Sequence, residues 1–321
     1  MSVDRQGRGF TELERELSLR TWLQRRSYDG RSFRVADLLD AKRETVSVVL
    51  PTRDVAATIG PVLDCLRPLE RQGLLDEIVV VDAASGDGTA AIAESHGALV
   101  LQESELMATH GPARGKGDAM WRGLSATSGD IVVFIDTDTE DFDEVFALGM
   151  IGPLLLDPEV QFVKGSFRRP FRVGEVSVPD GGGRVTELVA RPLLNLYVPE
   201  LAGFAQPLAG ETAARRPLLE SLSFPVGYGV EIAMMIDTVR AVGIDAMAQV
   251  DLGTRQNRHQ SLRDLSAMAH AVLVAASTRV HGREAIEPFG PGPLALPSAG
   301  TIEVRQVPLD ERPALRDLAT A

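Results

Sequence analysis

Two aspartates, Asp136 and Asp138, follow a run of apolar, mostly β-branched residues at positions 131–135. Such a run predicts a buried strand of a parallel sheet, and ligands bind beside the carboxyl ends of such strands. Two carboxylates at this edge suit Mg²⁺, with Mn²⁺ as the other candidate, because Mg²⁺ binds one or two carboxylates together with substrate phosphates. The plainer alternative is a strand that ends in a solvated acidic turn, since Glu140 and Asp141 follow closely.

Two polar segments nearer the N-terminus each follow a predicted strand. Pro51, Thr52, Arg53 and Asp54 come directly after the apolar run 46–50, at the place where a nucleotide-binding sheet contacts base and ribose. Their alternative is an ordinary loop between a strand and a helix.

The second of these segments contains Asp82 and Ser85 after the run 78–81. Asp82 can accept hydrogen bonds from a base or a ribose. Asp87, a little further on, is better interpreted as the cap of the next helix.

A third segment places Lys116 between Gly115 and Gly117. Two glycines around a cation let the backbone approach an anion closely. The longer glycine spacing and the terminal Ser or Thr of a P-loop are missing here, so the segment by itself does not predict a phosphate site.

Strands and helices alternate through the first half of the chain. Strands are expected at 46–50, 78–81, 98–101, 131–135 and 161–167, and helices at 61–69, 89–95 and 117–125. This alternation predicts right-handed βαβ units around a mostly parallel sheet. In the second half, helices are expected at 185–196, 230–242 and 262–277, and a strand at 246–252.

Composition excludes several classes of protein. The net charge of −12 argues against a general nucleic-acid binder, which needs a basic surface. No apolar run reaches the length of about 18 residues that a membrane helix needs. The single cysteine, Cys65, rules out an intramolecular disulfide framework and fits the cytoplasm.

The order of these motifs resembles the GT-A fold of glycosyltransferases that use nucleotide sugars, an α/β fold with a Rossmann-like nucleotide-binding domain. Further segments at 183–194, 207–211 and 227–232 resemble the retaining hexosyl-3-phosphoglycerate synthases, which include glucosyl- and mannosyl-3-phosphoglycerate synthases. The resemblance covers roughly residues 20–275.

The resemblance implies roles for particular positions. Asp136 and Asp138 match the metal motif, Arg184 and Glu231 match further catalytic positions, and a metal-binding histidine is expected near His259. The nucleotide sugar is expected to contact Pro51, Thr52, Arg53, Asp54, Asp82, Ser85, Lys116, Asp136, Thr137 and Tyr228. The acceptor is expected to bind Gly183, Arg184, Val185 and Thr186, where glycine permits close approach and arginine supplies a bidentate cation.

The sequence departs from the family pattern in two places. The first loop contains Arg53 where the glucosyl enzymes are usually more acidic, which favours guanine over uracil. The family's His-Arg-Asn triplet is reversed here to Asn257, Arg258 and His259. His259 can still face the ion, because residues i and i+2 point the same way in an extended chain. Asn257 or water is the alternative ligand, and an exposed loop histidine is a third possibility.

The resemblance therefore predicts a retaining transferase that moves mannose from GDP-mannose to the 2-hydroxyl of D-3-phosphoglycerate. The product would be a precursor of a compatible solute. Transfer of glucose from UDP- or GDP-glucose stays open, as does an inverting GT-A transferase with another acceptor. Other classes to weigh are a sugar-1-phosphate nucleotidyltransferase, whose glycine-rich first loop is missing, and a non-catalytic nucleotide-sugar binding protein.

For retention, front-face attack is favoured over a covalent intermediate on Glu231. The chain is expected to divide into a leader with a short helix (1–44), a nucleotide-sugar-binding half (45–167), an acceptor-binding half (168–280) and an extended arm (281–321). The arm and the apolar helix 262–277 favour a homodimer, which the family resemblance also implies.

Overall fold

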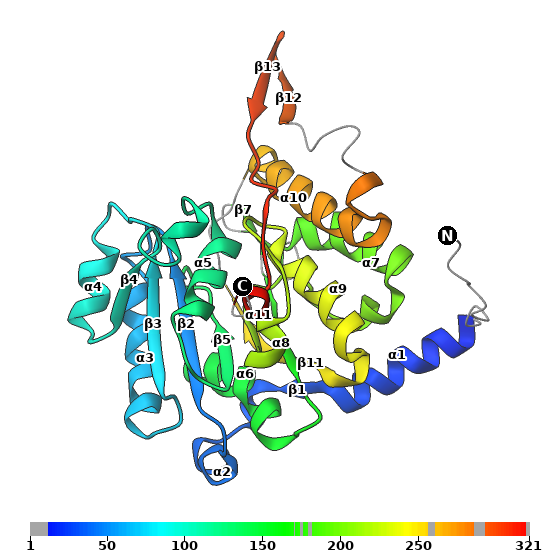
Figure 1. Ribbon diagram of the computed structural model, residues 1–321. Helices are drawn as coiled ribbons and strands as arrows, with labels where there is room; N and C mark the ends of the chain where they lie inside the picture. The colour runs from blue at the N-terminus through cyan, green and yellow to red at the C-terminus, as the bar shows by residue number, and fades with distance from the viewer. Residues whose placement is uncertain are drawn as a thin grey trace.

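The computed structural model describes residues 12–169, 171–173, 176–178, 182–255, 261–285 and 293–318. At its centre lies a sheet with the strand order β1-β11-β6-β9-β5-β2-β3-β4, covered by helices on both faces (Figure 1). Its strands are β1 (Ser27–Asp29), β2 (Val46–Thr52), β3 (Glu77–Asp82), β4 (Leu99–Gln102), β5 (Ile131–Phe134), β6 (Phe162–Arg168), β9 (Thr212–Arg215) and β11 (Met247–Thr254).

The helices form two layers. The first layer comprises α2 (Val35–Ala41), α3 (Ile59–Arg71), α4 (Thr89–Ser95) and α6 (Glu144–Leu156). The second comprises α1 (Glu12–Arg26), α5 (Lys116–Ser125), α7 (Arg191–Tyr197), α8 (Arg216–Glu220), α9 (Val230–Val242) and α10 (Leu262–His281). A π-helical turn, Thr186–Ala190, leads into α7.

Strand β2 shows why the sheet has two covered faces. Val48 and Leu50 pack into the core beneath α3 and α6, whereas Val49, between them, packs into the core beneath α5 and α9. Neighbouring residues of a strand point to opposite faces, so a run that is apolar at every position must be buried on both. The expected α/β architecture is therefore confirmed.

The sheet is mostly parallel, as expected, with one exception. β9 runs antiparallel to both β5 and β6 and separates them. β9 was not predicted from the sequence, because this strand (Thr212–Arg215) is short and shows no alternation of apolar and polar side chains. Helix α6 was also not predicted; it is apolar on nearly every side and therefore buried.

The N-terminal segment is attached to the body of the protein. Trp22 of α1 is buried, and its indole N–H donates to the carbonyl oxygens of Ile244 and Met247 at 3.1 and 3.0 Å. Strand β1 then adds a parallel edge to β11. The sheet thus takes a strand from the first 44 residues, and the four-part division of the chain stays a prediction.

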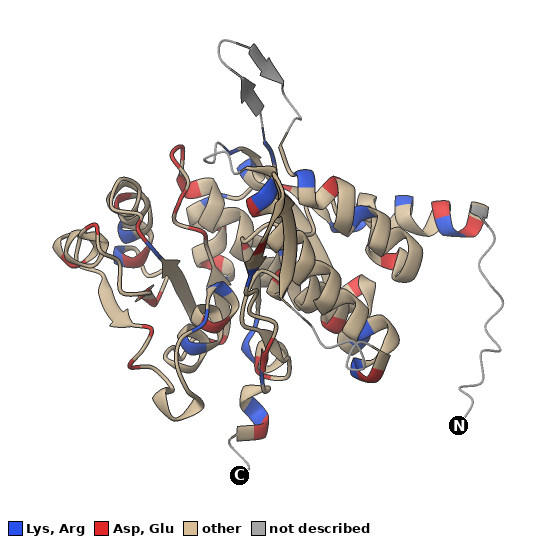
Figure 2. Ribbon diagram, turned by 90° about the horizontal axis from the view of Figure 1, so that it is seen from above, with Lys and Arg blue, Asp and Glu red and all other residues tan. Residues whose placement is uncertain are grey.

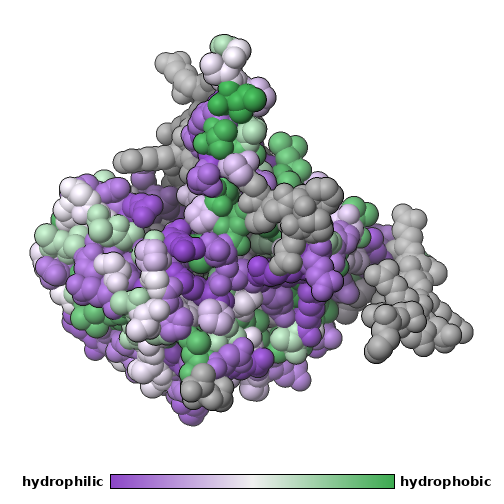
Figure 3. Space-filling model, turned by 45° about the horizontal axis from the view of Figure 1, so that its top comes forward, coloured by the Kyte–Doolittle hydropathy of each residue, from purple (hydrophilic) through white to green (hydrophobic). Residues whose placement is uncertain are grey.

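The C-terminal segment leaves the body and returns to it. Strands β12 (Leu294–Ser298) and β13 (Thr301–Arg305) form a hairpin that projects from the molecule (Figure 1). Apolar side chains, among them Ile302 and Val304, are exposed on this hairpin (Figure 3). The chain then returns through β14 (Glu311–Arg312), which pairs antiparallel with β10 (Phe224–Pro225), and ends in α11 (Leu315–Leu318).

A separate short hairpin, β7 (Phe171–Val173) with β8 (Val176–Val178), follows β6. Over the ribbon as a whole, Lys and Arg are interspersed with Asp and Glu (Figure 2). Among the residues that the structure describes, none of the helices combines the length and the apolar character that crossing a membrane requires.

Candidate functional site

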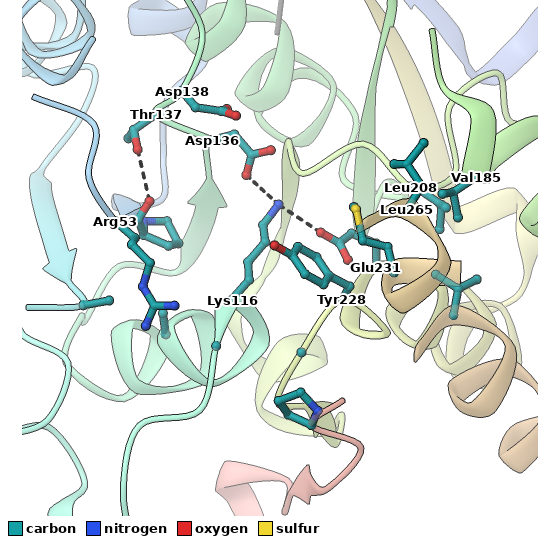
Figure 4. A pocket seen from close by; sticks show the side chains of 18 of the residues that line it. Arg53, Lys116, Asp136, Thr137, Asp138, Val185, Leu208, Tyr228, Glu231 and Leu265 are labelled. Carbon is teal, nitrogen blue, oxygen red and sulfur yellow. Dashed lines mark hydrogen bonds and ion pairs between the residues drawn. The ribbon is translucent and has the colours of Figure 1, made fainter. Parts of the chain in front are cut away.

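A cavity of about 590 Å³ opens at the carboxyl ends of β2 and β5, between the N-terminal ends of α5 and α9. Figure 4 shows Arg53 at one end, the apolar side chains of Val185, Leu208 and Leu265 at the other, and Lys116 in the middle. Predicted site residues on its wall are Pro51, Thr52, Arg53, Lys116, Asp136, Thr137, Asp138, Gly183, Arg184, Val185, Thr186, Tyr228 and Glu231. The structure thus brings the sequence motifs of both halves of the chain to one cavity.

Lys116 lies at the centre of the cavity because helix α5 begins there. Gly115 has a φ of 137°, which favours glycine, and a Cβ on Gly117 would lie 1.8 Å from the carbonyl oxygen of Pro225. Both glycines therefore have a backbone reason for their place. The Lys116 ammonium lies 2.6 Å from Oδ1 of Asp136 and 2.9 Å from Oε1 of Glu231 (Figure 4).

These two ion pairs set the charge of the lysine. Burial alone would lower the pKa of Lys116, but the charges of Asp136 and Glu231 outweigh burial and raise it above its usual value. Lys116 therefore stays a cation, placed to meet an anionic ligand. The sequence analysis predicted nucleotide contact for Lys116 but not its pairing with Glu231.

Arg255, at the end of β11, is a site residue that the sequence analysis missed. Its fully buried guanidinium donates to Oδ1 of Asp138 at 2.6 Å and approaches Oδ2 of Asp136 at 3.5 Å. It also pairs closely with the buried Glu211. Burial alone would raise the pKa of Asp136, but Lys116 and Arg255 hold that pKa well below its usual range.

Beneath these groups lies a second buried cation, Lys164 of β6. Its ammonium donates to the Thr212 hydroxyl of β9 at 2.9 Å. Burial lowers the pKa of Lys164 to about 8, although Glu231 and Glu211 act in the opposite direction. The floor of the site is thus a packed alternation of cations and carboxylates contributed by β5, β6, β9 and β11.

The carboxylates fit a hard divalent cation. Asp136 and Asp138 offer oxygen ligands to the cavity, and the side chain of Asp138 is 58% exposed. Within the described residues no cluster of three or more His, Cys, Asp or Glu could hold a metal ion. Two carboxylates suffice for Mg²⁺ or Mn²⁺ when substrate phosphates complete the coordination. His259 and Asn257 lie outside the described residues, so their part in the site stays a prediction.

Three predicted nucleotide contacts lie behind the cavity wall. Asp82 is buried and accepts hydrogen bonds from the backbone N–H of Ser85 at 3.1 Å and from Gln102 at 3.2 Å. The backbone N–H of Asp54 donates to the Ser85 hydroxyl oxygen at 2.9 Å, and the Asp54 carboxylate accepts from the N–H of Gly86 at 3.0 Å. These side chains shape the loops after β2 and β3, and their direct contact with a nucleotide stays a prediction.

The predicted acceptor segment lines the cavity near α10. Gly183 has a φ of 70°, which favours glycine, and its carbonyl accepts from the N–H of Glu187 at 3.0 Å. Thr186 is buried at the start of the π-helical turn, and Arg184 is half-buried. Two further arginines on the wall, Arg114 and Arg169, were not predicted.

Glu103 is another residue that the sequence analysis missed. It follows β4, and its backbone N–H donates to the carbonyl of Asp82 at 2.9 Å. It lines the cavity beside Arg53 and Ala83. Only the position of Glu103, two residues after the predicted strand 98–101, could have indicated it.

The sequence matches the profile of glycosyl transferase family 2 over residues 47–182. The glucosyl-3-phosphoglycerate synthase of Mycolicibacterium smegmatis is 44% identical over 259 residues, which are 80% of this chain and 85% of that protein. The glucosyl-3-phosphoglycerate synthase of Mycobacterium tuberculosis is 48% identical over 238 residues, or 73% of each chain.

The solved structures that share the fold include the following two. The mannosyl-3-phosphoglycerate synthase from Rubrobacter xylanophilus is 47% identical with a TM-score of 0.84, covering 93% of this chain and 99% of that one. The glucosyl-3-phosphoglycerate synthase of M. tuberculosis, solved with Mn²⁺, UDP-glucose and phosphoglyceric acid, is 42% identical with a TM-score of 0.79, covering 89% and 95%. The GT-A fold predicted from the sequence is therefore confirmed.

Proposed function

This chain belongs to the glucosyl- and mannosyl-3-phosphoglycerate synthase family of glycosyltransferases, and from that premise we propose that it moves mannose from GDP-mannose to the 2-hydroxyl of D-3-phosphoglycerate. The reaction retains the anomeric configuration of the sugar. Its product is mannosyl-3-phosphoglycerate, a precursor of a compatible solute.

The observation that carries the proposal is a concentration of cations around the cavity. The cavity is lined by Arg53, Arg114, Lys116, Arg169, Arg184 and Arg255 in a chain whose net charge is −12. A nucleoside diphosphate and a phosphorylated carboxylic acid are both anionic, so a cavity that binds them together needs such a set. The exposed carboxylate of Asp138 in the same cavity is suited to a divalent cation.

The two substrates occupy opposite parts of the cavity. The diphosphate lies beside Lys116, and the nucleoside extends toward Arg53. The acceptor binds at the Gly183–Thr186 segment, where backbone N–H groups, the Thr186 hydroxyl and Arg184 hold its phosphate and carboxylate. This positioning of the 2-hydroxyl against the anomeric carbon supplies much of the rate.

The transfer is a front-face displacement. The bond between the anomeric carbon and the diphosphate oxygen breaks while the acceptor 2-hydroxyl oxygen bonds to the same face of that carbon. The hydroxyl proton passes to the departing phosphate oxygen. A bound divalent cation at Asp136 and Asp138 neutralises the charge that develops on the diphosphate. Glu231 is held by Lys116 and positions the sugar rather than attacking it.

The preference for a guanine nucleotide rests on the first loop. Arg53 lies on the wall at the nucleoside end (Figure 4), and arginine is well suited to the O6 and N7 acceptors of guanine. The similarity to the Rubrobacter enzyme supports mannose as the sugar. Transfer of glucose from UDP- or GDP-glucose is the second candidate, supported by the glucosyl-3-phosphoglycerate synthases among its relatives.

The protein acts as a homodimer in the cytoplasm. The single cysteine fits a reducing compartment. The projecting hairpin exposes Ile302 and Val304, apolar surface that a second copy of the chain would cover. Sedimentation equilibrium tests the dimer: a monomer at micromolar concentration would contradict it, and Ile302→Glu should weaken association.

The experiment that tests the function is a product assay with separate donors. Purified protein, D-3-phosphoglycerate and Mg²⁺ or Mn²⁺ receive GDP-mannose, GDP-glucose or UDP-glucose, and the product is identified by mass spectrometry and NMR. We expect α-mannosyl-3-phosphoglycerate, and loss of product with Asp138→Asn. A β-linked product would instead indicate an inverting enzyme. No transfer from any donor would overturn the proposed acceptor.

A further inference from the structure

The buried side chain of Glu103 leaves one of its carboxyl oxygens without a hydrogen-bond partner in the described part of the chain. The residue is 2% exposed, and its Oε1 has no partner atom among the residues that the structure describes. Burying a carboxylate oxygen that has no hydrogen-bond partner costs free energy of folding. Titratable groups in such environments occur preferentially at functional sites. Glu103 also lines the cavity, so a ligand there can reach it.

A purely structural role does not account for Glu103. The nearby guanidinium of Arg122 is satisfied by Asp118 at 3.0 Å and by backbone carbonyls. Arg312 of β14 is satisfied by Asp118 in the same way, at 2.7 and 2.8 Å. Neither arginine forms an ion pair with Glu103 within the described ranges. Asp118 repels the carboxylate, which burial already disfavours.

Glu103 lies near enough to Arg53 for their charges to interact, and Arg53 marks the end of the cavity proposed for the nucleoside (Figure 4). Three adjacent strands end there and contribute Thr52 at the end of β2, Ala83 after β3 and Glu103 after β4 to the wall. Ala119 of α5 also lines the cavity and has only a small side chain. A base that enters from the diphosphate at Lys116 therefore extends its far edge toward these strand ends.

We propose that Glu103 is the residue that selects the base of the donor, by accepting hydrogen bonds from the N1–H and the 2-amino group of guanine. This inference rests on the proposed function, in which the donor is a GDP-sugar, and it assigns the selectivity to one side chain.

The chemistry of the bases supports the assignment. Guanine presents two adjacent donors on one edge, which match the two oxygens of an ionised carboxylate. Uracil presents a single N–H between two carbonyl oxygens. A carboxylate beside this edge would accept one hydrogen bond and would lie against a carbonyl oxygen, which repels it. A base that leaves the buried carboxylate without a hydrogen bond also binds with lower affinity. Arg53, whose charge acts on Glu103, complements the O6 and N7 side of guanine.

The test compares nucleotide affinities by calorimetry in the presence of Mn²⁺. The nucleotides are GDP, UDP and IDP. IDP differs from GDP only in lacking the 2-amino group of the base. We expect the wild-type protein to bind GDP about 10-fold more tightly than IDP and about 100-fold more tightly than UDP. Glu103→Gln should remove most of the difference between GDP and IDP. Glu105→Gln, an exposed control two positions away, should keep it.

Each result decides the inference. Equal affinity of the wild-type protein for GDP and IDP would overturn it without any variant, so a misfolded Glu103→Gln would not leave it open. An unchanged GDP-to-IDP ratio in Glu103→Gln would overturn it as well. Tighter binding of UDP than of GDP would overturn both the inference and the guanine preference. If GDP is selected but no sugar reaches 3-phosphoglycerate, the proposed function fails and the inference stands.

Discussion

The guanidinium of Arg255 lies 2.6 Å from Oδ1 of Asp138, the more exposed carboxylate of the predicted metal motif. The arginine therefore competes with a divalent cation for the same oxygen. Because Arg255 also neutralises the buried Glu211, it links the exposed edge of the site to its floor.

Replacing Arg255 by Gln should change metal binding and stability in opposite directions. Without the competing cation, Mn²⁺ affinity in the absence of nucleotide should rise severalfold, as measured by electron paramagnetic resonance of free Mn²⁺. Glu211 would lose its buried partner, which should cost about 3–5 kcal/mol in the free energy of unfolding. Weaker Mn²⁺ binding would instead mean that Arg255 holds the carboxylates in position for the ion.

Lys116→Met should lower kcat by about 100- to 1,000-fold, because the proposed site of the departing diphosphate loses a fixed cation. Lys42 provides a matched control, since it pairs with Asp76 at 2.6 Å away from the cavity wall. Lys42→Met should leave kcat unchanged. Equal losses in both variants, measured by initial rates at saturating donor, would mean that Lys116 acts through stability alone.

Gly210→Ala should disturb the metal motif from the backbone side. A Cβ on Gly210 would lie 2.2 Å from Oδ2 of Asp136, so that carboxylate would have to move. A misplacement of this size should reduce the transfer rate by about 100-fold. Thermal unfolding and Mn²⁺ binding should be measured alongside the rate. Unchanged Mn²⁺ binding and rate would show that Asp136 can relax without loss.

The affinity for GDP should depend on pH through Glu103. Burial and the charge of Asp118 raise the pKa of Glu103 to about 7, against the lowering effect of Arg122, Arg53 and Arg312. The N–H donors of guanine favour the ionised form of Glu103, so binding of GDP lowers the pKa of this carboxyl. GDP binding should therefore weaken as the pH drops below about 7, because Glu103 becomes protonated in the free protein. Calorimetry across this range should show the weakening in the wild-type protein. Glu103→Gln should bind GDP with a flatter pH profile; an equally steep profile would assign the titration to another group.

The ion pair between Arg122 and Asp118 should dominate the stability of α5. Both side chains are fully buried, and Asp118 also receives Arg312 from the C-terminal strand β14. Arg122→Met should cost about 3–5 kcal/mol in the free energy of unfolding, because Asp118 loses a buried partner. Arg20→Met, at an exposed pair with Glu16, should cost no more than about 0.5 kcal/mol. Urea unfolding measures both; similar costs would contradict the buried network.

Most of the fold could be predicted from the sequence where periodicity was strong. Helices α4 and α9 begin and end at the predicted residues, 89–95 and 230–242. The ends of β2 and β5 were within two residues of the prediction. Strand β9 could not be predicted, because its place between β5 and β6 is fixed by pairing with distant strands rather than by local pattern.

The candidate site could be predicted only in part, because some of its residues are brought to the cavity by the sheet and belong to no recognisable motif. Asp136, Lys116 and Glu231 carried motif signals, and the structure brings them within hydrogen-bonding distance. Arg255 and Glu103 lie in ordinary-looking sequence and reach the cavity only because the sheet places the ends of β11 and β4 at its edge. Nothing in the sequence indicated that the side chains of Asp82 and Asp54 accept hydrogen bonds from backbone N–H groups of the loop after β3, behind the cavity wall.

The most direct test of the account is a competition between donors in one reaction. Isotopically labelled GDP-mannose and unlabelled UDP-glucose are supplied in equal amounts with D-3-phosphoglycerate and Mn²⁺. Mass spectrometry reports which hexose reaches the product, and NMR reports its anomeric configuration. We expect labelled, α-linked mannosyl-3-phosphoglycerate in large excess. An unlabelled glucosyl product in excess would contradict the proposed donor and the role of Glu103 together.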